Sequence, residues 1–126
     1  MILLLGGTGY IGQAFALAQE ANRYLDCRAP WKNLKVNRED AATSLWTAIA
    51  VINCLKVALA PFLPFTSQRV HQFLGCAGSV ESEQWDFDRI LAGVKPGQTL
   101  QRPENLYIKL EPQVAEEESQ RLGIKV

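Results

Sequence analysis

The segment from about Glu39 to Ala60 constrains the fold of this chain more than any other feature. Its large aliphatic residues recur every three or four positions, which places them along one side of an α-helix. They are Leu45, Ile49, Ile52, Leu55 and Leu59. Asn37 is a suitable N-cap, and Pro61 and Pro64 stop a helix. We therefore expect a long central helix whose aliphatic stripe forms the core.

Shorter helical patterns flank this segment. The first predicts a helix from Tyr10 to about Arg28, because apolar residues recur at helical spacing and Ala29-Pro30 leaves the α region. Thr66 or Ser67 can cap a third helix that Gly75 ends. The remaining expected elements are helices at 68–74 and 112–122, one or two helical turns within 85–91, a loop at 76–83 and an extended stretch at 106–110.

Composition indicates one ordinary globular domain. The chain has 126 residues, of which 48% are hydrophobic and 21% charged, and its 13 basic side chains balance its 13 acidic ones. A strongly basic nucleic-acid binder and an acidic disordered chain are therefore both disfavoured. No apolar run approaches the roughly 20 residues that span a bilayer, since Lys56 interrupts the longest one. We expect no membrane partner.

The three cysteines are spaced too far apart for a CxxC motif. Their odd number and spacing argue against a disulfide framework and a zinc knuckle. We expect Cys27, Cys54 and Cys76 to be buried thiols in a cytoplasmic protein, with no metal and no cofactor.

A glycine motif stands near the N-terminus. Gly7, Gly9 and Gly12 form a GxGxxG pattern between an apolar run and a helix, the context in which backbone N–H groups bind a pyrophosphate. This opening resembles short-chain dehydrogenases and epimerases, which implies an NAD(P)-binding fragment as an alternative. However, no second strand with an acidic residue follows, and no Tyr-x-x-x-Lys pair exists. We expect residues 1–15 to form a glycine-rich arm, irregular or extended.

A longer pattern covers residues 16–111. It comprises the segment from Ala18 to Lys32, the segment from Ala60 to Arg69, Leu74-Gly75, Trp85, Gly97, and the stretch from Leu106 to Glu111. These landmarks resemble the C-terminal anticodon-binding domain of methionyl-tRNA synthetases. The resemblance implies an all-α fold over residues 16–126, a truncated helical bundle of the class I aminoacyl-tRNA synthetase anticodon-binding type. It also implies binding of a methionine tRNA through its CAU anticodon.

The same resemblance implies roles at one corner of the bundle. In the family, the residue at the position of Trp31 stacks on the anticodon, and the residues at the positions of Asn22 and Pro30 help to shape that site. The physics agrees, because Pro30 ends a helix and displays the indole of Trp31 on a turn, where an unpaired base can stack. Asn22 can hydrogen-bond a base edge or brace the turn. Arg28, Lys32 and Lys35 can neutralise phosphates.

Other aromatic residues receive structural interpretations. The alternative for Trp31 is an aromatic plug that closes the bundle, and we expect Trp46 and Trp85 in the core. His71, the single histidine, is expected to face solvent or to serve a satisfied structural role.

Two absences limit the function. With one histidine and with Met1 as the single methionine, the chain has neither the His-Ile-Gly-His-type nor the Lys-Met-Ser-Lys-Ser-type segment of the catalytic domain. We therefore expect no ligase activity. An earlier helix of the family's bundle is also missing, so we expect an uncovered helix face. That face predicts self-association, a catalytic-domain partner or cover from residues 1–15. The remaining alternative is a helical remnant that needs a partner chain.

Overall fold

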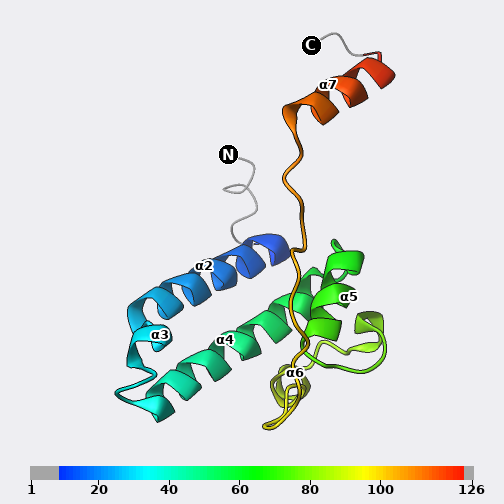
Figure 1. Ribbon diagram of the computed structural model, residues 1–126. Coiled ribbons are helices and arrows are strands. Elements are labelled where there is room, and N and C mark those ends of the chain that lie inside the picture. Colours follow the sequence, from blue (N-terminus) through cyan, green and yellow to red (C-terminus); the bar gives the residue numbers. More distant parts are fainter. Residues whose placement is uncertain (1–8, 124–126) are drawn as a thin grey trace.

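The computed structural model describes residues 9–123, and every regular element in that range is a helix (Figure 1). The elements in chain order are α2 (Tyr10–Arg28), α3 (Pro30–Asn33), α4 (Arg38–Leu59), α5 (Pro64–Phe73), the 3₁₀ helix η1 (Val80–Ser82), α6 (Phe87–Ala92) and α7 (Pro112–Arg121). The all-α prediction is confirmed. The predicted apolar run before the glycine motif lies outside the described residues.

Helix α4 is the centre of the bundle. It contacts α2, α3, α5, α6 and η1, and Figure 1 shows α2 lying alongside it. Its start is capped as predicted, because the backbone N–H of Asp40 donates to Asn37 Oδ1 at 3.1 Å. It ends at Leu59, just before Pro61. This helix therefore determines where the other helices can lie.

The predicted core stripe of α4 is wrong. Leu45 and Ile52 are exposed, and Ile49, Leu55 and Leu59 are partly exposed. The buried residues of α4 are mostly small: Ala41, Ser44, Asn53, Cys54, Lys56, Val57 and Ala58. Small side chains let α2 approach closely, whereas the helices in the described range leave the larger aliphatic side partly or fully exposed. The aliphatic side of α4 that we expected to form the core is thus the exposed side of this helix.

Helix α4 is also long and apolar enough to cross a membrane, by length and composition alone. The prediction that no apolar segment is long enough to span a bilayer is therefore wrong for α4. The core helix of a bundle meets the same criterion, and α4 contacts five other elements here. Lys56 belongs to this helix, and its side chain is fully buried beside Glu83. We accordingly interpret α4 as a core helix.

The elements after α4 differ from prediction mainly at their boundaries. Helix α5 begins at Pro64, so neither Thr66 nor Ser67 caps it. Gly75 follows its end with φ +71°, the conformation expected of a glycine at that position. The predicted 76–83 loop contains η1, and residues 106–110 form no strand. Helix α7 stands apart from the bundle in Figure 1 and has no buried residue.

Candidate nucleic-acid interface

A sharp corner joins α2 to α3. Ala29 has φ 40° and ψ 58°, and in the described range it is the one non-glycine residue with positive φ. Its N–H donates to Leu25 O at 2.8 Å, which closes the end of α2. Pro30 is buried at the first position of α3, where its missing N–H costs nothing. The chain thus leaves α2 at Ala29 and begins a new helical turn at Pro30.

Trp31 stands on that turn and is 61% exposed. The alternative of an aromatic plug is wrong, because a plug would be buried. Pro30 beneath it is buried, so the indole projects from a fixed base. An open π face on a rigid corner is the geometry that stacking on an unpaired base requires.

A hydrogen-bond network holds the corner against α4. Arg28 Nη2 lies 2.6 Å from Asp40 Oδ1, and Asn33 Nδ2 lies 3.4 Å from Asp40 Oδ2. Asn33 Nδ2 also donates to the carbonyl oxygen of Arg28 at 3.2 Å. Asp40 therefore connects α2, α3 and α4 around Trp31. From the sequence, no role at this corner was predicted for Asn33 or Asp40.

The predicted cations of this corner fall into two groups. Arg28 forms an ion pair with Asp40. Its guanidinium group therefore stabilises the corner, and its charge is partly neutralised. Lys32 and Lys35 are exposed, and neither has an ion-pair partner within residues 9–123. These two lysines are the available positive charges beside Trp31.

Asn22 lies apart from the other predicted residues. It is exposed on α2, six residues before Arg28, or about 9 Å along the helix axis. No hydrogen bond joins it to the Trp31 corner within the described part of the chain. The structure therefore does not use Asn22 as a brace for the Pro30 turn.

Tyr24 is a further residue at this corner that the sequence did not single out. Arg28 Cζ lies 6.0 Å from its ring centroid, a cation–π contact. The neighbouring hydroxyl groups of Thr47, the larger cause, and of Ser44 lower the pKa of its phenol. Tyr24 therefore lies beside α4 at the end of α2.

The other two tryptophans are not core residues. Trp46 is exposed on α4, and Trp85 is 64% exposed in the segment before α6. Both predictions of burial are wrong for one reason: the described helices cover neither side chain. Trp85 instead packs against Tyr10, with ring centroids 5.9 Å apart.

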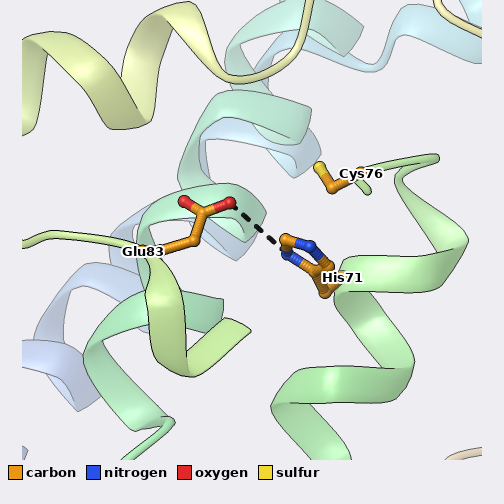
Figure 2. A group of neighbouring side chains, drawn as sticks. All are labelled: His71, Cys76 and Glu83. Atoms are coloured by element: carbon orange, nitrogen blue, oxygen red, sulfur yellow. Dashed lines mark ion pairs between the residues drawn. The ribbon is translucent and has the colours of Figure 1, made fainter. Parts of the chain in front are cut away.

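His71 belongs to a buried polar cluster between α4, α5 and η1 (Figure 2). Its Nδ1 lies 2.9 Å from Lys56 Nζ and 3.5 Å from Glu83 Oε1. Its Nε2 lies 3.0 Å from Ala77 O, and because a carbonyl only accepts, Nε2 carries the hydrogen. The satisfied structural role predicted for His71 is confirmed, and the solvent-facing alternative is wrong.

The same cluster contains three residue types that bind metals. His71, Cys76 and Glu83 offer ligand atoms within 4.8 Å of one another (Figure 2). However, Lys56 Nζ lies 2.9 Å from His71 Nδ1, 3.4 Å from Glu83 Oε1 and 3.8 Å from Cys76 Sγ. The ammonium thus takes the position of a metal ion, and this arrangement does not fit a metal centre.

The thiols differ in environment. Cys54 is buried, Cys76 is partly buried and Cys27 is exposed, so the prediction of three buried thiols is wrong for Cys27. Burial raises the pKa of the Cys54 thiol.

The glycine motif is only partly described. Gly7 lies outside the described residues, Gly9 is the N-cap of α2, and Gly12 is inside α2. Residues 10–15 are therefore helical and not part of an extended arm. No strand occurs between residues 9 and 123, so the structure adds nothing in favour of an NAD(P)-binding fragment.

Known proteins match most of this chain. A family model described as the anticodon binding domain of methionyl tRNA ligase matches residues 13–125. Among curated proteins, a methionine–tRNA ligase of Dehalococcoides mccartyi strain CBDB1 is 49% identical over 111 residues, which cover 88% of this chain and 19% of the relative. The methionine–tRNA ligase of Thermomicrobium roseum is 38% identical, over 87% of this chain and 23% of the relative.

These matches delimit what the chain contains. It spans only about a fifth of the length of the curated relatives, and the matched part is the anticodon-binding part without the catalytic domain. No solved structure gives a significant match. With an all-α bundle and a family match over 13–125, the chain belongs to the family of anticodon-binding domains of methionyl-tRNA ligase.

Proposed function

We propose that this domain binds the CAU anticodon loop of methionine tRNA, with Trp31 stacked on an unpaired anticodon base. One observation carries the proposal: the indole is 61% exposed on a corner that buried Pro30 fixes beneath it. Side chains read RNA mainly in single-stranded loops, where bases can be splayed out and stacked on aromatic rings. The family match supports tRNA as the ligand, and the exposed indole of Trp31 supports stacking as the mode of contact.

The charges around the corner suit the same ligand. Lys32 in α3 and Lys35 just after it are exposed and free to contact phosphates, while Arg28 stabilises the corner through Asp40. Asn22 is exposed on the preceding helix and is proposed to hydrogen-bond a base edge. Phosphate contacts fix the position of the loop, and the stacked and hydrogen-bonded bases give selectivity.

A titration at several salt concentrations tests the proposal. The ligands are a CAU anticodon stem-loop and the same stem with an altered loop sequence. We expect tighter binding of the CAU loop, and Lys32→Ala should reduce the slope of log affinity against log salt by about 0.7, the value for one lost single-strand phosphate contact. Lys109→Ala, an exposed lysine on the distant 106–110 stretch, is the control. Equal affinity for the two loops contradicts anticodon reading, and absence of binding favours the helical remnant.

We further propose that the domain acts as part of a methionine–tRNA ligase in the cytoplasm, where its partners would be tRNA and a catalytic domain. The relatives that match it are named methionine–tRNA ligases, and this chain matches about a fifth of their length. The exposed aliphatic side of α4 offers a surface for a catalytic-domain partner or for a second copy. Activity of the assembled ligase is then a property of the longer protein.

A further inference from the structure

A pocket of about 460 Å³ lies far from the Trp31 corner. Tyr10 at the first residue of α2 lines it, about 27 Å along that helix from Arg28. Val57 and Val80, both buried, form part of its apolar floor. The volume is in the range of pockets that hold small organic molecules.

Aromatic rings form one side of this pocket. Tyr10 and Trp85 line it, with ring centroids 5.9 Å apart and 54° between the planes. Phe62, which is outside the lining, lies 6.0 Å from Tyr10 at 41°. None of these rings stacks flat on another. Trp85 is 64% exposed, so its indole offers a π face to a ligand. The π faces of aromatic rings carry negative electrostatic potential and attract cations.

The charged residues that line the pocket are both acidic. Glu81 is exposed, and Glu83 reaches the pocket while its Oε1 contacts Lys56 and His71. No lysine or arginine of the described residues lines it. This combination disfavours a phosphate or any other anion. A cation gains attraction from a carboxylate at the edge of the pocket, whereas a neutral apolar ligand does not.

We propose that this pocket binds an alkylammonium group. The cation would lie against the rings of Tyr10 and Trp85 with the carboxylate of Glu81 beside it. A small metal ion fits less well, because hard cations require several oxygen ligands and the pocket offers one carboxylate that is free of Lys56. The two sources of an alkylammonium group are a free polyamine and a lysine side chain of another protein.

The test follows the three indole N–H signals of the full chain by two-dimensional NMR, with Trp85→Phe assigning one of them. The probes are choline and 3,3-dimethylbutanol, its neutral isostere. We expect choline to shift the Trp85 signal saturably and to bind at least threefold more tightly than the alcohol. Trp85→Ala, which lacks that indole signal and is therefore followed through the backbone amide signals of Tyr10 and Glu81, should bind choline about two- to fivefold more weakly, as expected for loss of one exposed cation–π contact.

Glu81→Gln, on an exposed side chain, is the second variant and should also weaken choline binding, whereas Trp46→Ala on the surface of α4 should not. Spermidine and an Nα-acetylated lysine amide then distinguish a polyamine from a protein side chain by which binds more tightly. Equal affinity for the alcohol, equal loss in Trp46→Ala, or no saturable shift would overturn the proposal. Because tRNA is absent from these titrations, their failure leaves the anticodon proposal unaffected.

Discussion

Arg28 Nη2 and Asp40 Oδ1 lie 2.6 Å apart and join the last turn of α2 to the first turn of α4. The pair spans the corner that carries Trp31. Asn33 adds a second donor to the same carboxylate at 3.4 Å. This network can therefore influence how the turn that carries Trp31 is oriented.

Asp40→Asn tests this arrangement. Both partners are partly exposed, so we expect a loss of no more than about 1 kcal/mol in the free energy of unfolding. Affinity for the anticodon stem-loop should fall several-fold, because the corner becomes less ordered. Stability is measured by urea unfolding and affinity by titration. Glu39→Gln, an exposed acidic residue on the same turn, is the charge-matched control. Equal effects of the two variants would show that only net charge matters.

Gly75 provides a test of backbone conformation. It has φ +71°, and an added Cβ would lie 2.3 Å from the carbonyl oxygen of Thr99. Gly78 has φ +81° with no atom within 4 Å of an added Cβ. We expect Gly78→Ala to cost about 1–2 kcal/mol of stability from backbone strain alone, and Gly75→Ala to cost more. Thermal unfolding of both variants measures the difference. Equal losses would mean that the Thr99 contact relaxes without cost.

The uncovered side of α4 predicts self-association. Leu45 and Ile52 are exposed there, and burying such side chains against a second copy is favourable by roughly 25 cal/mol per Å² of apolar surface. The double variant Leu45→Lys and Ile52→Lys should shift sedimentation towards monomer with little change in melting temperature. Val36→Lys, also at an exposed apolar residue, should leave the association unchanged. A parent chain that stays monomeric at high concentration contradicts the prediction.

The thiols predict an order of reactivity and a pH dependence. Cys27 is exposed and Cys54 is buried, so a thiol reagent should modify Cys27 first and Cys54 last in the folded chain. Burial raises the pKa of Cys54 above its value in the unfolded chain. Its contribution to stability is therefore complete below the unfolded pKa and is lost as pH rises through the folded one. Urea unfolding should show that the free energy of unfolding decreases from neutral to alkaline pH. This decrease should be smaller in the Cys54→Ala variant.

The sequence predicted the helices better than their buried faces. Asn37 and Pro64 act through local backbone chemistry, so the start of α4 and the limits near α5 can be deduced from neighbours in the chain. Burial of Leu45 or Trp46 depends on whether another element covers them. Periodicity shows which side of a helix is apolar, but it cannot show that the covering helix is absent.

In the candidate site, too, features that depend on neighbouring residues could be predicted, and features that depend on packing between helices could not. Exposure of Trp31 could be predicted because Pro30 acts on the adjacent backbone. The network of Arg28, Asn33 and Asp40 could not, since it depends on how α2 approaches α4. Lys56 beside His71 likewise joins residues 15 positions apart through the packing of two helices.

Affinity of the Trp31→Ala variant for a CAU anticodon stem-loop, at fixed salt, tests the central claim most directly. Stacking of one base is worth roughly 1–3 kcal/mol, so the variant should bind about fivefold to 150-fold more weakly. Trp31→Phe should retain part of the affinity, and Trp46→Ala should match the parent chain. Unchanged affinity in Trp31→Ala, with the fold intact by circular dichroism, would contradict the claim that this indole stacks on the anticodon.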